Sequence, residues 1–194
     1  MAKKKIPPTL TKGVAKVPVV MQLEALECGA ASLAMVMAYY GKWVPLEEVR
    51  LSCGVSRDGS NAKNIYHAAQ HYGFDIKAMR MSPESLQKNG KFPCIIHWNM
   101  NHFVVLDGFR GKYAYLNDPA RGRTKVTMEQ FDKSFTGVVL IPTPSGTFQP
   151  AISTSASPTM RSSAMICSGA QRTPTTSSST TWSSRPSSVP GCSS

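Results

Sequence analysis

Apolar residues follow helical spacing in the first half of the chain and extended spacing in the second half. The helical spacing predicts helices over residues 28–40, 44–51, 61–72 and 82–89. The extended runs predict strands over residues 74–80, 92–98, 102–109, 113–118, 123–127 and 138–141, with a short helix over 128–133. Pro142 and Pro144 are expected to end the last strand. Helices that come first and antiparallel strands that follow are typical of an α+β fold.

The first predicted helix begins with a cysteine, Cys28, and ends before Gly41. The backbone N–H groups of a first helical turn point outward unpaired, and together with the helix dipole they lower the pKa of a thiol placed there. Such a thiolate is a nucleophile. Gln22, six residues earlier, carries a side-chain amide that can donate to an oxyanion beside the sulfur. A buried structural cysteine at the start of an apolar core helix fits the same pattern, so a base and an orienting group must be sought downstream.

A histidine and an aspartate in the strand region can supply that base and its orienting group. If strands 102–109 and 113–118 form a hairpin about residues 110–112, paired positions sum to about 221 or 222. His102 then lies opposite residue 119 or 120, within one or two positions of Asp118. Two competitors are weaker, because Asp107 lies near the turn and His97 has no acid placed to orient it. Cys28, His102 and Asp118 thus form a candidate constellation for acyl transfer.

The net charge of +11 comes mostly from the two ends of the chain. Residues 1–20 hold five lysines and no acid, and three arginines without an acid follow Pro150. The region 21–150 holds 14 basic and 11 acidic residues, and no basic helix or aromatic-interleaved patch stands out there. Nucleic-acid binding is therefore not expected.

The chain has five cysteines at wide spacings and no CxxC pair, which argues against a disulfide framework and against a zinc site. His67 and His71 lie four residues apart without a third ligand, so no metal site is expected. Neither a secretory signal nor an apolar run long enough for a membrane span is visible. The sequence thus predicts a soluble protein in a reducing compartment.

Composition divides the chain into three parts. Residues 1–17 are basic and contain Pro7, Pro8 and Gly13, so they are expected to be a flexible segment. Residues 18–148 hold all the predicted helices and strands and are expected to form the folded domain. Half of residues 151–194 are Ser or Thr, so the segment 149–194 is expected to be disordered or a non-native extension.

Four motifs resemble one family. Gln22-x5-Cys28-Gly-Ala-Ala, Tyr39-Tyr-Gly, His102-Phe-Val-Val-Leu and Asp118-Pro-Ala-Arg-Gly, in this order and spacing, look like the bacteriocin-processing peptidase domain of peptidase-containing ABC transporters. The resemblance covers roughly residues 15–148. It implies a papain-like cysteine protease fold, with an N-terminal helical part packed on a C-terminal antiparallel sheet. It also implies a cysteine endopeptidase that removes leader peptides after Gly-Gly or Gly-Ala.

The resemblance implies a role for each motif residue: Cys28 as nucleophile, His102 as general base, Asp118 as its orienting group and Gln22 as oxyanion donor. The implied partners are the leader of a secreted precursor peptide and the membrane and ATPase domains of a transporter. The implied location is cytoplasmic, at the inner face of the cell membrane. No cofactor is expected for the domain, because ATP would serve only the ATPase domain.

The leader is expected to dock as an amphipathic helix in an apolar groove. The candidates for that groove are Tyr72, Phe74, Ile76, Met79 and Met81, although a structural core explains the same residues. Two other functions stay open. One is a docking module that binds the leader without cleaving it. The other is a different papain-like acyl transfer, such as that of a transglutaminase or an amidase.

Overall fold

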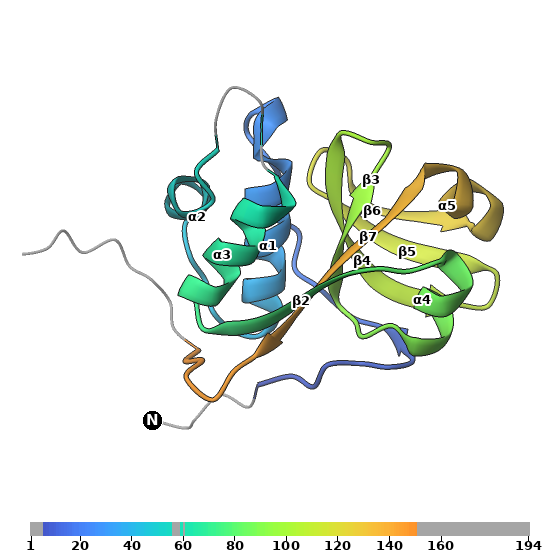
Figure 1. Ribbon diagram of the computed structural model, residues 1–194, viewed down its shortest axis with the longest axis horizontal. Coiled ribbons are helices and arrows are strands. Elements are labelled where there is room, and N and C mark those ends of the chain that lie inside the picture. The colour runs from blue at the N-terminus through green and yellow to red at the C-terminus, as the bar shows by residue number, and fades with distance from the viewer. Residues whose placement is uncertain (1–5, 56–58, 60, 151–194) are drawn as a thin grey trace, which may run out of the picture. The chain divides into compact units, whose positions relative to one another are not determined.

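The computed structural model describes residues 6–55, 59 and 61–150, and the statements below concern these residues. Three helices lie together on one side, and an antiparallel sheet with two further helices lies on the other (Figure 1). The helices are α1 Cys28–Tyr39, α2 Leu46–Ser52, α3 Ala62–His71, α4 Pro83–Asn89 and α5 Met128–Ser134, with a 3₁₀ turn η1 at Ala25–Glu27. The strands are β1 Gly13–Val14, β2 Phe74–Arg80, β3 Cys94–Trp98, β4 His102–Arg110, β5 Tyr113–Asp118, β6 Gly122–Thr127 and β7 Phe135–Pro144. The α+β prediction is confirmed.

The sheet runs in the order β2-β7-β3-β4-β5-β6, and β1 pairs with β4. All paired strands are antiparallel. The chain therefore forms a meander from β3 to β6 and returns through α5 to place β7 between β2 and β3.

Both faces of the central strands are buried, which explains why the sequences of β3 and β4 are nearly continuous apolar runs. One face of these strands packs with α1 and α3 in the first hydrophobic core, to which Ile95, Phe103 and Val105 belong. The other face lines a second core, to which Ile96 and Val104 belong and which α4 and α5 close. Alternate residues of one strand thus serve two different cores.

α1 is buried over nearly its whole length, as a helix that is apolar on all sides must be. Its small residues let it lie close to β4. The hydroxyl of Ser32 donates to the backbone oxygen of Phe103 at 3.2 Å. This contact fixes the beginning of α1 beside the beginning of β4, where Cys28 and His102 lie.

The hairpin register expected from the sequence is close to the observed one. Next to the two-residue turn Gly111-Lys112, Arg110 pairs with Tyr113. The register then shifts by one at Asp107, so that Val105 pairs with Asn117. Continued to the open end of the hairpin, this register brings His102 level with the residues that follow Asp118, as predicted.

The expected end of the last strand differs from the structure. β7 continues through Pro142 and Pro144, which pair with β2. These prolines are tolerated because the pairing of β7 with β3 extends only as far as Leu140, so no β3 hydrogen bond is lost there.

The expected domain start at residue 18 is also wrong, because residues 10–17 are held on the sheet. The Val17 oxygen accepts from Arg123 Nη2 at 2.8 Å and from Asn117 Nδ2 at 3.1 Å, and the Val17 side chain is fully buried. The sequence pattern could not show this docking, because it depends on partners about 100 residues away.

No helix in the described part of the chain is long and apolar enough to cross a membrane. The predicted turn over residues 57–60 falls mostly outside the described residues, as do residues 1–5 and the Ser/Thr-rich residues 151–194.

Substitution of Gly108 by alanine tests the docking of β1. Gly108 has φ +141°, and an added Cβ would collide with the backbone oxygen of Gly13. We expect Gly108→Ala to lower the free energy of unfolding by roughly 2–4 kcal/mol, measured by urea denaturation followed by circular dichroism. The matched control is Gly111→Ala, at φ +60° with no atom near the new Cβ, which is expected to cost about 1 kcal/mol. Equal losses in the two variants would contradict the close contact between β1 and β4.

Candidate active site

Cys28 is the first residue of α1 and is 4 % exposed. The 3₁₀ turn η1 ends directly before it, so the chain turns sharply into the helix at this point. The side chain of His102 and the backbone groups of Phe103 and Gly29 act on the sulfur and lower the pKa of the thiol. The predicted position of Cys28 in a first helical turn is thus observed, and its sulfur faces the start of β4.

His102 begins β4 and Asp118 ends β5. His102 Nε2 lies 2.8 Å from Asp118 Oδ1. The same carboxylate oxygen accepts the backbone N–H of Ala120 at 2.8 Å, which fixes its orientation. Because Nε2 is engaged by Asp118, the other ring nitrogen, Nδ1, is the one available to Cys28. The structure therefore brings together Cys28, His102 and Asp118, which the sequence analysis proposed as one constellation.

The environment shifts each of the three pKa values toward the charged form. The hydrogen bond to Asp118, and then the one to Cys28, raises the pKa of His102 to about 9. Burial opposes ionisation of the Cys28 thiol, but hydrogen bonds from His102 and Phe103 and the charge of His102 together lower its pKa. Burial likewise opposes ionisation of Asp118, and the hydrogen bonds from His102 and Ala120 lower its pKa nonetheless. These shifts together favour a thiolate–imidazolium pair over a neutral thiol and imidazole.

Gln22 lies in the segment before η1. Its backbone N–H donates to the Pro119 oxygen at 2.9 Å, which ties this segment to the residue after Asp118. Its side-chain oxygen is buried without a hydrogen-bond partner among the described residues. The nitrogen of the same amide is the atom that can donate to a charged oxygen that forms during the reaction.

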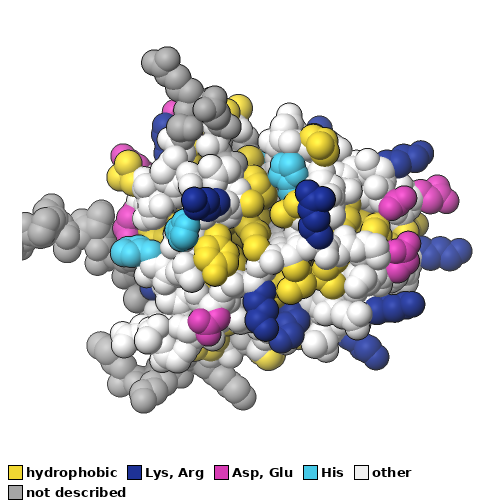
Figure 2. Space-filling view, viewed as in Figure 1, with side chains coloured by type: hydrophobic (Ala, Val, Ile, Leu, Met, Phe, Trp, Pro, Cys, Tyr) yellow, Lys and Arg dark blue, Asp and Glu magenta, His cyan; other side chains and the backbone are white. Residues whose placement is uncertain are grey.

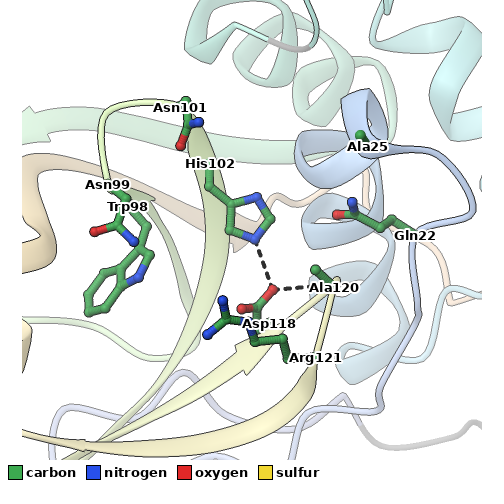
Figure 3. A pocket seen from close by; sticks show the side chains of 9 residues that line it. All are labelled: Gln22, Ala25, Trp98, Asn99, Asn101, His102, Asp118, Ala120 and Arg121. Carbon is green, nitrogen blue, oxygen red and sulfur yellow. Dashed lines mark hydrogen bonds and ion pairs between the residues drawn. The ribbon is translucent and has the colours of Figure 1, made fainter.

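Gln22, His102 and Asp118 line one pocket of about 320 Å³ (Figure 3). The three side chains come from different parts of the chain and converge on one space, where Asp118 hydrogen-bonds the His102 imidazole and the Gln22 side chain points toward that imidazole (Figure 3). The other lining residues are Ala25, Trp98, Asn99, Asn101, Ala120 and Arg121. The pocket has room for a peptide segment beside the imidazole.

Residues 16–147 match the Peptidase C39 family. The chain belongs to this family. The match covers most of the described residues and confirms the resemblance seen in the four motifs. The enzyme class follows from it: the protein is a cysteine peptidase.

Solved structures support the same conclusion. One is a double-glycine motif protease from an AMS/PCAT transporter, crystallised in complex with the leader peptide. It is 68 % identical in sequence to this chain, with a TM-score of 0.70. The match covers 71 % of this chain and 98 % of that one. The peptidase domain of Streptococcus ComA, a bifunctional ABC transporter involved in a quorum-sensing pathway, is 25 % identical, with a TM-score of 0.62 over 65 % of this chain and 97 % of that one. The papain-like α+β fold is thereby confirmed.

A curated relative is a much longer protein. The probable microcin-H47 secretion/processing ATP-binding protein MchF of Escherichia coli is 38 % identical over 125 residues, which are 64 % of this chain. The peptidase C39 domain described here spans only 18 % of the length of that relative.

The two competing residues of the sequence analysis lie in other environments. His97 Nδ1 hydrogen-bonds the hydroxyl of Thr136 at 2.9 Å, and burial together with the charge of His102 lowers the pKa of His97. Burial raises the pKa of Asp107 to about 7. Asp107 lines a separate pocket, beside residues 14–16. Neither residue is among the groups that shift the pKa of Cys28.

The predicted leader groove is wrong for three of its five residues. Tyr72, Phe74 and Ile76 are 5 %, 2 % and 7 % exposed, because they pack in the first core. Met81 is partly buried against the second core, and Met79 is 37 % exposed. Phe74 and Ile76 share the inward face of β2, and Tyr72 follows directly after α3, so these side chains point to the core rather than outward.

An apolar surface does exist on the peptidase domain. Hydrophobic side chains gather in the middle of the face shown in Figure 2, between the helices on the left and the strands on the right. Of the five predicted groove residues, Met79 is the one exposed enough to contribute to a surface of this kind.

Two charged residues near the site were missed by the sequence analysis. Arg121 lines the pocket, and its charge helps to lower the pKa of Asp118. Glu27, directly before Cys28, is 2 % exposed, which is unusual for an acid. The pair Glu24 and Glu27 has the spacing of a capping box, which was the available signal.

No group of three or more His, Cys, Asp or Glu side chains that could hold a metal ion occurs among the described residues. The three cysteines in the described part of the chain are all buried and free.

Thiol alkylation tests the electrostatics of Cys28. Burial raises the pKa of Cys53 to about 12 and also raises the pKa of Cys94, whereas the pKa of Cys28 is lowered. We expect iodoacetamide to modify Cys28 at least about 10-fold faster than Cys53 and Cys94 at pH 7, because only the thiolate reacts. Peptide mapping by mass spectrometry would assign each modified site.

His102→Ala is the matched variant for this measurement. It removes the largest cause that lowers the pKa of Cys28, so the pH at which Cys28 alkylation is half-maximal should rise. An unchanged pH dependence would contradict the thiolate–imidazolium pair.

Proposed function

We propose that this peptidase C39 domain cleaves the leader peptide from a ribosomally made, secreted precursor peptide of the bacteriocin or lanthipeptide type, after a Gly-Gly or Gly-Ala motif. The observation that carries the proposal is the Cys28–His102–Asp118 constellation, with the Gln22 side chain in the same pocket as His102 and Asp118. The likeness to a double-glycine motif protease, at 68 % identity, supports the choice of substrate.

In the proposed mechanism the Cys28 thiolate attacks the carbonyl carbon of the second residue of the Gly-Gly or Gly-Ala motif. The backbone N–H of Cys28 and the side-chain amide of Gln22 hold the oxygen as it becomes negative. The protonated His102 then gives its proton to the leaving amine, and a thioester remains on Cys28. Asp118 keeps the imidazole oriented through Nε2, with the proton for transfer on Nδ1.

Water completes the reaction. His102, now neutral, takes a proton from a water molecule that attacks the thioester carbonyl, and the same two donors stabilise the second oxyanion. The Cys28 sulfur leaves as a thiolate and the leader leaves with a free carboxylate. These side chains supply the whole reaction, so the domain is proposed to need no cofactor.

The cleavage is proposed to be coupled to export. MchF is a secretion/processing ATP-binding protein and ComA is a bifunctional ABC transporter. We infer that this domain works with the membrane and ATPase domains of an ABC transporter, in the cytoplasm at the inner face of the cell membrane. ATP would serve the ATPase domain.

Cleavage of a synthetic leader–core peptide that contains Gly-Gly tests the proposed function. Mass spectrometry should show one cut, directly after the second glycine, by the wild-type chain and none by Cys28→Ala. Binding of the leader without a cut would favour the docking module instead. A product in which the leader carboxyl is joined to an added amine, rather than to water, would favour another papain-like acyl transfer.

The pH dependence of cleavage tests the role of Asp118. Activity requires a deprotonated Cys28 and a protonated His102, so kcat/KM should fall at high pH with a midpoint of about 9, where His102 loses its proton. Asp118→Asn removes the charge and weakens the largest cause that raises the pKa of His102, so the alkaline midpoint should move to lower pH. A shift of that midpoint to higher pH would contradict the assignment.

A further inference from the structure

We propose that Glu27 is a positioning residue that holds the Gln22 amide in place for the oxyanion. Glu27 Oε2 accepts the backbone N–H of Leu23 at 3.0 Å and that of Glu24 at 3.1 Å. These are the two residues directly after Gln22. One carboxylate oxygen thus fixes the backbone that carries the candidate oxyanion donor.

The other carboxylate oxygen is anchored to a different element. Glu27 Oε1 lies 3.1 Å from Arg50 Nη1, in the last turn of α2. Arg50 Nη2 in turn lies 3.2 Å from Glu24 Oε2. The Glu27 side chain is 3 % exposed, and a carboxylate buried this far is stable only when its oxygens are paired. The contacts described satisfy both oxygens.

The segment from Gln22 to Glu27 is therefore held at both ends. At one end the Gln22 N–H binds the oxygen of Pro119, which follows Asp118. At the other end Glu27 directly precedes Cys28. The segment thus links Gln22, Cys28 and the residue that follows Asp118, so movement of its backbone would change the distance from the Gln22 amide to the Cys28 sulfur.

Side-chain packing contributes little to holding this segment. The side chain of Leu23 is 86 % exposed, and that of Leu26 is 40 % exposed. A segment with few buried apolar side chains is ordered mainly by its polar anchors. Because an oxyanion donor must be in position before the charge develops, the loss of an anchor should weaken the transition state more than the substrate complex.

If Glu27 has only a structural role, its substitution should have a different effect. Glu27 also takes part in the capping box of η1, together with Glu24. If capping is its whole contribution, substitution lowers stability and leaves the chemistry of the folded enzyme unchanged. The two roles are separated by measuring kcat and KM well below the melting temperature of each variant.

The experiment compares Glu27→Ala and Glu27→Gln with the wild-type chain, using cleavage of the Gly-Gly peptide. We expect Glu27→Ala to lower kcat roughly 10–100-fold, less than the full loss of an oxyanion donor, with KM changed less than about 2-fold. Glu27→Gln keeps one acceptor oxygen and should retain roughly 3–10-fold more activity than Glu27→Ala. Glu47→Gln is the matched control, since it removes an exposed acid of α2 and should leave kcat unchanged.

A second readout isolates the oxyanion. The Cys28 thiolate adds to the carbonyl carbon of a leader peptide that ends in a Gly-Gly aldehyde, and the carbonyl oxygen of the tetrahedral adduct, whether charged or protonated by His102 to the hemithioacetal, lies among the same donors. The affinity for this aldehyde should fall by about the same factor as kcat, as expected for a transition-state analogue. The affinity for the unmodified leader and the rate of Cys28 alkylation should stay within about 2-fold of wild type.

The inference rests on the proposed function, and the outcomes separate the two. A wild-type chain that cleaves, together with Glu27 variants that keep both kcat and aldehyde affinity, would overturn the role of Glu27 alone. Parallel losses in leader affinity, alkylation rate and aldehyde affinity would also overturn it, because they indicate general disruption of the site. A wild-type chain that does not cleave would overturn both proposals.

Discussion

The pairing of a thiolate with an imidazolium, at the meeting point of α1 and β4, is the interaction on which the site depends. Burial alone would keep both groups neutral, and in the environments of Cys53 and Cys94 the thiol is indeed held protonated. Cys28 differs because hydrogen bonds and the charge of His102 outweigh the cost of burial. The fold must therefore hold two elements, α1 and β4, in a fixed relation.

The arrangement of the two cores maintains that relation. β4 contributes one face to the core shared with α1 and the other face to the core closed by α4 and α5. A strand buried on both sides has little freedom to shift. The hydrogen bond from Ser32 to the Phe103 oxygen adds a direct link between α1 and β4, close to Cys28 and His102. Rigid elements, rather than loops, thus carry the nucleophile and the base.

The segment before α1 is held in a different way. It carries the Gln22 amide but has exposed apolar side chains, and polar contacts to Pro119, Glu27 and Arg50 hold it instead. A reaction that needs a donor only in the transition state can tolerate such an arrangement, provided that the anchors keep the donor in place. Arg50 also connects this segment to α2, an element that contributes no residue to the pocket.

The sequence by itself determined the order of helices and strands, the position of Cys28 in a first helical turn and the approach of His102 to Asp118. These follow from local rules, since helical and extended spacings, Gly stops and hairpin pairing act over a few residues. Only the tertiary structure decided that Tyr72, Phe74 and Ile76 are core, because the outward face of a strand depends on what covers it. The same holds for Glu27, whose partner Arg50 is distant in sequence, and for residues 10–17, whose partners are about 100 residues away. Contacts between distant segments leave no periodic trace in the sequence, so they appear only once the chain is folded.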